Sequence, residues 1–244
     1  MERIEFWRNE LQGARLYDGR AKDSFSRICA ALEANSGASF SAACAGSLRQ
    51  SGGRLFAHEK TTGEGLQYGH YEQTAQRCSG KTVVVAQDTT ELNYTTHRAK
   101  MGLGHIGSDK SLRGVLVHTA LAVGRDGVPL GVIGQKGWVR ADADFAKTVR
   151  RRQMPIEAKE SYKWIEGLRW AERLSEQATK VIVVADREGD VYEYLSAPRR
   201  ANVSLIVRAA QARRTTESAS TPVSYTHLRA HETPEHLVCR LLLE

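Results

Sequence analysis

The fold is decided by two short apolar runs, each of which ends in an aspartate. The first run is TVVVAQDTT (residues 82–90), and the second is VIVVADREGD (residues 181–190). Runs of β-branched residues of this length are typical of buried strands. If the carboxyl ends of two such strands meet at one edge of a sheet, Asp88 and Asp186 come within reach of a shared divalent metal. The pattern predicts an α/β fold with metal-dependent chemistry on phosphate esters.

The charge balance favours a polyanionic partner. Lys and Arg number 35 against 28 Asp and Glu, which gives a formal net charge of +7. That excess alone also fits an ordinary basic protein. The arginines, however, gather at residues 150–152, 199–200 and 213–214, and local charge density drives counterion release from nucleic acid. We therefore expect a nucleic-acid partner.

Cysteine spacing and hydropathy exclude several other classes. None of the four cysteines forms a C-x-x-C pair, so a zinc knuckle is not expected. The sparse cysteines fit a reducing compartment, and no apolar run reaches membrane-spanning length. The sequence therefore predicts a cytoplasmic protein without a membrane partner.

Residues 1–80 are predicted to form a small all-helical domain. Asp18 is a plausible N-cap of the first clear helix, and residues 35–37 a plausible stop. Two more helices are expected over residues 45–58 and 62–77. We expect this domain to bind DNA, and a structural collar on the main domain is the alternative. The first helix has an apolar stripe of Ala21, Phe25, Ile28 and Leu32, with Lys22, Asp23, Ser26 and Arg27 off the stripe.

Residues 81–214 are predicted to form the α/β core. A hairpin turn is expected at GRDG (residues 124–127), and a long helix over residues 157–178. Its stripe runs through Trp164, Leu168, Ala171, Leu174 and Ala178, with Lys163 off it. A short helix over residues 190–195 is expected to be capped by Asp190. Strands are expected at residues 82–87, 115–123, 128–138, 181–185 and 203–207. This element order is that of a ribonuclease-H-like mixed sheet with flanking helices.

The last segment, residues 215–244, differs in composition from the rest of the chain. It turns to Ser and Thr and then reads VSYTHLRAHET (residues 223–233). This stretch resembles translated sequencing-adapter read-through, so we expect a non-native or disordered tail. A genuine helix near residues 234–243 is the alternative.

Several motifs, taken together, resemble one family. The stretch QDTTELNY (residues 87–94) resembles the first catalytic motif of insertion-sequence DDE transposases of the transposon-five type, and DREGDVY (residues 186–192) resembles the second. The resemblance covers most of residues 15–210, in the family's order. It also runs through GHIGSDKSLRG (residues 104–114), VH (117–118), GWVR (137–140) and KESYKW (159–164).

The resemblance implies a site, a cofactor and partners. Asp88 and Asp186 would bind the catalytic Mg2+ ions, for which Mn2+ is a possible substitute. The intact enzyme would cut transposon ends and transfer the strand by two-metal phosphoryl transfer. Its partner would be double-stranded DNA at transposon ends, bound by a dimer in the bacterial cytoplasm at the nucleoid. DNA contacts are implied for Arg54, Lys110, Arg113 and Arg208.

The chain departs from the family at the third acid. The family places this glutamate on a later helix, in a Tyr-Arg-Glu-Lys pattern that is absent here. Glu188 lies two residues after Asp186 but is not expected to replace it. We therefore expect a truncated chain that is inactive alone. The alternatives are a non-catalytic DNA-binding inhibitor of transposition and another ribonuclease-H-like nuclease, such as a junction resolvase.

Two further side chains are given ordinary roles. His118 lies in a predicted strand, where we expect a packed side chain rather than a metal ligand. Trp138 is expected either to cover the sheet edge or to stack on a base.

Overall fold

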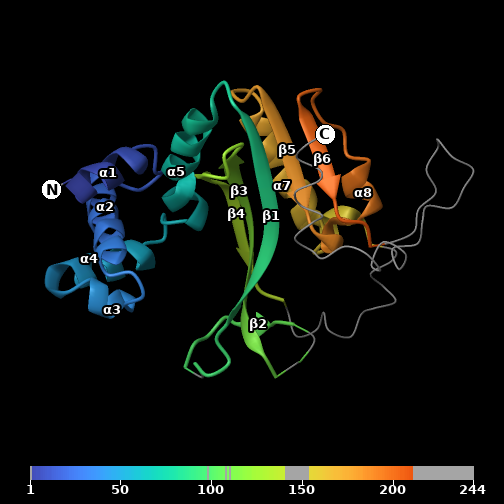
Figure 1. Cartoon of the computed structure of the whole chain (residues 1–244). Helices are drawn as coiled ribbons and strands as arrows, with labels where there is room; N and C mark the ends of the chain where they lie inside the picture. The colour runs from blue at the N-terminus through green and yellow to red at the C-terminus, as the bar shows by residue number, and fades with distance from the viewer. Residues whose placement is uncertain (1, 98, 108, 110, 141–153, 211–244) are drawn as a thin grey trace, which may run out of the picture.

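The computed structural model describes residues 2–97, 99–107, 109, 111–140 and 154–210. The predictions for Lys110, for the arginines at 150–152 and 213–214, and for the tail at 215–244 fall outside the described residues. The described chain is a mixed α/β fold, in which a six-stranded sheet follows a series of helices (Figure 1).

The sheet has an antiparallel half and a parallel half that meet at β1. On one side β1 pairs antiparallel with β3, which pairs antiparallel with β2 and β4. On the other side β1 pairs parallel with β5, which pairs parallel with β6. The strands are β1 (Thr82–Asn93), β2 (Gly104–His105), β3 (Arg113–Gly124), β4 (Pro129–Trp138), β5 (Lys180–Ala185) and β6 (Val203–Val207).

The predicted hairpin is confirmed, and the predicted end of the first strand is wrong. Gly127, with φ of +79°, closes the turn between β3 and β4 by donating to the Gly124 carbonyl at 3.0 Å. Strand β1 continues six residues past its expected end at Gln87, so that Asp88 lies inside the strand. The reason is β3, which pairs with β1 as far as Asn93, whereas the pairing with β5 ends at Gln87.

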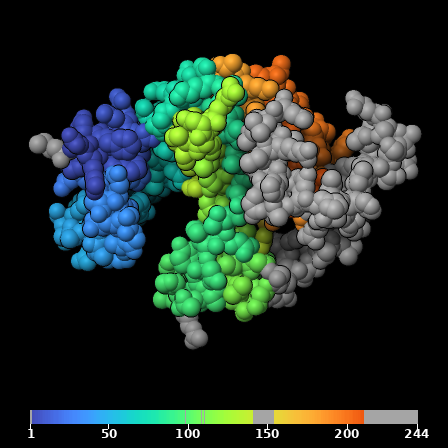
Figure 2. All heavy atoms as spheres, in the orientation of Figure 1, coloured from blue at the N-terminus to red at the C-terminus, as the bar shows by residue number. Residues whose placement is uncertain are grey.

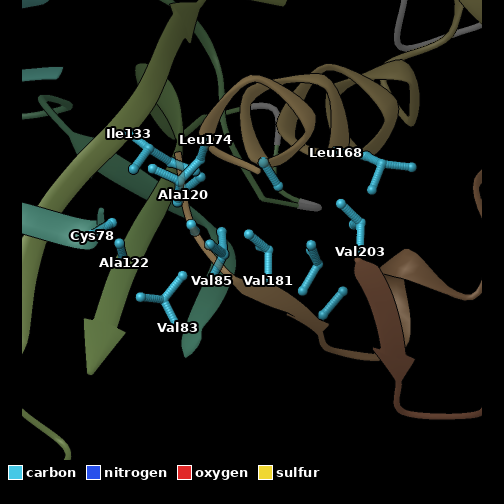
Figure 3. Packing of buried hydrophobic residues seen from close by; sticks show 14 of the residues in the cluster. Cys78, Val83, Val85, Ala120, Ala122, Ile133, Leu168, Leu174, Val181 and Val203 are labelled. Atoms are coloured by element: carbon cyan, nitrogen blue, oxygen red, sulfur yellow. The ribbon is translucent and has the colours of Figure 1, made fainter. Parts of the chain in front are cut away.

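Helix α7 (Tyr162–Leu174) covers one face of the sheet and forms the main core with it. Figure 3 shows Leu168 and Leu174 over the strand residues Ala120, Val85 and Val181. The predicted apolar stripe is therefore confirmed, although the helix is shorter than residues 157–178. It is preceded by a separate 3-10 turn, Ile156–Ala158, and Ala178 is buried beyond its end.

The structure corrects two side-chain assignments in this region. Lys163 was expected on the exposed side of α7 but is only 7% exposed, because its ammonium group pairs with Glu188 at 3.0 Å. Asp190 was expected to cap the short helix α8 (Tyr192–Leu195), whose N-cap is Val191. Asp190 is instead buried, and it accepts a hydrogen bond from the backbone N–H of Ala210 at 2.7 Å.

The segment before β1 is helical, and its second helix has the predicted boundaries. The Asp18 carboxylate accepts from the Ala21 N–H at 2.6 Å, and Asn35 is the C-cap. Ser26 was expected off the apolar stripe but is buried, with its hydroxyl donating to the Lys22 carbonyl at 3.1 Å. The helices are α1 (Glu2–Glu10), α2 (Gly19–Ala34), α3 (Phe40–Ala43), α4 (Gly46–Ala57) and α5 (Gly63–Cys78).

Helices α2 to α4 share a small apolar cluster, which includes Ile28, Cys44 and Leu55, and α1 packs on α2. In the surface view they form a lobe at one side of the molecule, while the segment around β2 forms a separate projection (Figure 2). Helix α5 joins the lobe to the sheet, because it packs on β4 and buries Cys78 in the main core. Within the described ranges, no helix is long and apolar enough to span a membrane.

Candidate functional site

The structure brings Asp88 and Asp186 together on neighbouring strands. Gln87 of β1 pairs in parallel register with Ala185 of β5, and the two aspartates are the next residue of each chain segment. Backbones of paired strands lie about 4.8 Å apart. Val83, Val85 and Gln87 are buried toward α7, so Asp88 projects from the opposite face. The same alternation in β5 places Asp186 on that opposite face too.

Both carboxylates are exposed and are oriented by backbone amides. The Oδ1 atom of Asp88 accepts from the Thr89 N–H at 2.7 Å, and Oδ1 of Asp186 accepts from the Glu188 N–H at 2.9 Å. The second bond makes Asp186 the N-cap of the 3-10 turn Arg187–Gly189. An ionised carboxylate offers about four acceptor positions, so both side chains retain capacity for another ligand.

The two aspartates belong to a longer row of polar side chains that crosses the sheet, which we call the polar row. Arg208 is level with Asp186, because Ala185 pairs with Val207 and the Arg208 N–H donates to the Ala185 carbonyl at 3.1 Å. On the other side, Thr119 of β3 pairs with Asp88, and Gln135 of β4 donates to the Thr119 hydroxyl at 2.9 Å. The polar row is Gln135, Thr119, Asp88, Asp186 and Arg208.

Thr119 and Gln135 were not among the site residues expected from the sequence. Each is a common polar residue in a strand, and only the cross-strand register places it beside Asp88. The register of β3 with both β1 and β4 would have identified both residues.

Glu188 pairs with Lys163 and is not a member of the polar row. Its carboxylate pairs with the Lys163 ammonium group, which also lies 5.7 Å from the centre of the Trp138 ring. Trp138 is half-buried beside this pair and lines a hollow of about 720 Å³ between the end of β4 and the start of α7. The cations there, such as Arg140 with Glu160 at 2.6 Å, have carboxylate partners.

The other expected DNA contacts lie apart from the polar row. Arg54 is exposed in the last turn of α4, in the N-terminal lobe. Arg113 begins β3 and is half-buried, and its guanidinium donates to the Leu103 carbonyl at 2.6 Å. That bond holds the loop before β3, so part of the Arg113 side chain is committed to the fold.

The acidic pair is suited to a hard divalent cation. Mg2+ is commonly held by one or two carboxylates together with waters and substrate phosphate oxygens, and Asp88 and Asp186 supply two carboxylates on one exposed face. In the part of the chain that the structure describes, no cluster of three or more His, Cys, Asp or Glu side chains is arranged to hold a metal. No model of a known protein family matches the sequence.

Proposed function

We propose that this chain belongs to the DDE transposases and that Asp88 and Asp186 hold Mg2+ for phosphoryl transfer on DNA. The observation that carries the proposal is the shared position of the two carboxylates, level on adjacent parallel strands and on the same exposed face. Two carboxylates that lie side by side on one face can be bridged by a divalent cation.

The architecture supports the proposal. The antiparallel order β4, β3, β1 followed by the parallel order β1, β5, β6 is compatible with a ribonuclease-H-like sheet. In open sheets of this type, ligands bind beyond the carboxyl ends of the parallel strands. Asp186 and Arg208 lie there, directly after β5 and β6.

The chemistry divides between the metal and the side chains of the polar row. A bound Mg2+ pair would activate a water or a 3′-hydroxyl and stabilise the leaving oxygen. Asp88 and Asp186 would hold the cations on the exposed face of the sheet. Arg208 is exposed at the same level. It would contact a backbone phosphate of the DNA strand that is cut, because a guanidinium is well matched to a phosphate group.

Helix α4 supports DNA as the substrate. It carries Arg49, Gln50 and Arg54 as exposed side chains and has no acidic residue in its sequence GSLRQSGGRLFA. Arginine and glutamine are the residues that most often contact guanine and adenine edges in the major groove. We propose that α4 contacts duplex DNA while the polar row faces the phosphodiester to be cut.

The metal proposal can be tested with Mn2+ and backbone amide resonances of the full chain. The Thr89 and Glu188 amides donate to the two carboxylates, so a shared site predicts that both resonances broaden at the same Mn2+ concentration. Asp88→Asn should abolish the broadening at both. Broadening that occurs at one amide only, or that persists in Asp88→Asn, would contradict a shared site.

The DNA proposal can be tested by selection from a random pool of duplexes. A transposase is expected to enrich one end sequence, and Arg54→Ala should weaken binding to it, with Arg20→Ala in the exposed start of α2 as a matched control. A junction-specific nuclease would instead prefer a four-way junction and enrich no sequence. Cleavage of the selected duplex is expected to be weak, because a pair of carboxylates alone should bind metal loosely.

A further inference from the structure

Directly behind Asp88, on the α7 face of the sheet, lies a buried chain of hydrogen-bonded side chains. The His118 ring contacts the Thr89 hydroxyl through Nδ1 at 2.9 Å and the Gln87 Oε1 atom through Nε2 at 3.2 Å. The Gln87 amide nitrogen then donates to the Tyr194 hydroxyl at 3.2 Å. We call these four residues the His118 chain.

The His118 chain grips β1 on both sides of the first carboxylate. Gln87 and Thr89 flank Asp88 in the sequence, and side chains alternate between the faces of a strand. Both flanking side chains therefore reach His118 on the buried face, while Asp88 projects from the exposed face. A rotation or slip of β1 that moved the Asp88 carboxylate would have to break at least one of these two bonds.

The His118 chain also reaches the segment that carries the second carboxylate. Tyr194 lies on α8, shortly after Asp186 and the turn that Asp186 caps, and its side chain is fully buried. Its ring packs against the Trp164 ring of α7, with the ring centres 6.1 Å apart. The two acid-bearing segments are thus joined by direct side-chain contacts beneath the sheet, in addition to the backbone pairing of β1 with β5.

The surrounding core leaves little room for another arrangement. His118 is 0% exposed and meets the Trp164 ring edge-on, with centres 4.9 Å apart. Gly167 of α7 lies over Gln87 so closely that an added Cβ atom would come within 2.1 Å of the Gln87 Oε1 atom. A glycine at this position lets the helix approach the sheet while the Gln87 side chain stays beneath it.

The state of the imidazole matches its two partners. Burial, together with the nearby Lys163 and Lys136 ammonium groups, lowers the pKa of His118 to about 4. A neutral imidazole has one donor and one acceptor nitrogen. With the Gln87 amide oriented as observed, Nε2–H donates to Gln87, and Nδ1 accepts from the Thr89 hydroxyl.

We infer that His118 is a positioning residue, which through Gln87, Thr89 and Tyr194 holds Asp88 in line with Asp186 for metal binding. The inference rests on the proposed function. Hydrogen bonds among buried neutral groups contribute little net stability, because the same groups bond to water in the unfolded chain. Apolar side chains would fill this core as well, whereas a fully satisfied polar network restricts the strand to one arrangement.

The test compares Mn2+ binding by the unaltered protein with Mn2+ binding by a variant that lacks the hydrogen bonds of the His118 chain. In Gln87→Leu/His118→Leu/Tyr194→Phe the three buried polar side chains leave together, and only the hydroxyl of half-buried Thr89 loses its partner, so folding should be retained. We expect the Mn2+ concentration that broadens the Thr89 and Glu188 amides to rise about tenfold, the size of effect seen when partners of metal ligands are removed. The two amides should also cease to respond together.

Two single variants accompany the triple variant. Gly167→Ala should displace the Gln87 side chain without substituting any residue of the His118 chain, and it should also weaken Mn2+ binding. Leu116→Ala is the control, because Leu116 is equally buried on the same face of β3, two residues from His118, yet lies outside the network. It should lower stability and leave the Mn2+ midpoint of the folded protein unchanged.

The outcomes distinguish failure of the metal site from failure of the positioning role of His118. If the unaltered chain shows no broadening at Thr89 or Glu188, the proposed metal site itself fails. If the unaltered chain broadens at both amides and the triple variant does so at the same Mn2+ concentration, His118 has no positioning role. A shift in Leu116→Ala as large as that in the triple variant would also overturn the inference, because general loosening of the core would then explain it.

Discussion

The contact that joins the N-terminal lobe to the sheet gives the sharpest stability prediction. Glu10 ends α1, and its carboxylate accepts two hydrogen bonds at 2.8 Å from the Arg77 guanidinium and contacts the His70 ring at 2.6 Å. The Arg77 guanidinium also donates to the Leu130 carbonyl at 2.6 Å, and the other nitrogen of His70 accepts from the Val132 N–H at 3.0 Å. One carboxylate therefore connects α1, α5 and β4.

The expected loss of unfolding free energy in Glu10→Gln follows from the burial of Glu10 and its partners. The Glu10 side chain is 7% exposed, the Arg77 side chain 36% and the His70 side chain 28%. Removing one partner of a fully buried ion pair costs about 3–5 kcal/mol. Water can reach the Arg77 guanidinium, so we expect the lower end of that range, about 3 kcal/mol, for Glu10→Gln. Removing the exposed Arg8 and Asp23 pair, at 2.7 Å, should cost less than about 1 kcal/mol.

The same contact predicts an acid transition. Burial raises the pKa of Glu10, but the hydrogen bonds from Arg77 and His70 outweigh it, and the net pKa lies below the usual value of 4.5. A lowered carboxyl pKa stabilises the fold above the unfolded-state pKa, and this contribution disappears as the pH falls through the folded-state value. Glu10→Gln should therefore flatten the loss of stability below about pH 4.5.

Urea unfolding at pH 7, followed by tryptophan fluorescence and by circular dichroism, measures the effect. The unaltered chain, Glu10→Gln and Arg8→Ala are compared, and Arg77→Met with the double variant completes a mutant cycle. A loss for Glu10→Gln no larger than that for Arg8→Ala would refute the reasoning. So would a cycle in which the effects of Glu10→Gln and Arg77→Met simply add.

Three further predictions concern the sheet. Asp88→Asn or Asp186→Asn should leave the metal-free protein as stable or raise its unfolding free energy by less than about 1 kcal/mol, since one of two neighbouring like charges is removed, and Mg2+ should no longer raise the thermal midpoint. A midpoint that still rises with Mg2+ in both variants would place the metal elsewhere. The pKa of His118 is lowered to about 4 in the folded protein, whereas it is about 6.5 in the unfolded chain. As the pH drops from about 6.5 to 4, the unfolded chain therefore binds a proton that the folded protein does not, and the free energy of unfolding should fall by roughly 2–3 kcal/mol. The triple variant that lacks His118 should show a smaller drop in urea titrations over that range, and an equal drop would count against the buried neutral imidazole. Gly134→Ala would place its Cβ atom 2.1 Å from the Trp170 ring and should lower the free energy of unfolding by about 1–3 kcal/mol through overpacking. Calorimetry measures this loss, and Gly53→Ala, whose Cβ atom meets no neighbour, is the control.

The strands and the main helix could be predicted because their signals are local. The β-branched runs before Asp88 and Asp186 became β1 and β5, and the apolar stripe of α7 became its buried face. The extension of β1 to Asn93 could not be predicted, because DTTELN has no apolar alternation. These residues are strand because β3 offers them a partner, and pairing of this kind is a property of the sheet.

The buried polar groups were the least predictable part of the structure. Lys163 was expected off the buried stripe of α7, and it is buried because Glu188 reaches it from the turn after β5. His118 was expected to be a packed side chain, and it is buried as expected. Its hydrogen bonds to Gln87 and Thr89 depend on the antiparallel register of β3 with β1, which the sequence does not encode in any short window.

The sequence by itself determined the order of the long strands, the two apolar runs that lead into Asp88 and Asp186, and the helix that covers them. Each of these depends on residues that are close together along the chain, where periodicity and propensity act. Only the tertiary structure decided that Asp88, Asp186 and Arg208 are level on one face and that Thr119 and Gln135 extend the row. The physical reason is register: a slip of one residue between two strands would turn every side chain of one of them to the other face.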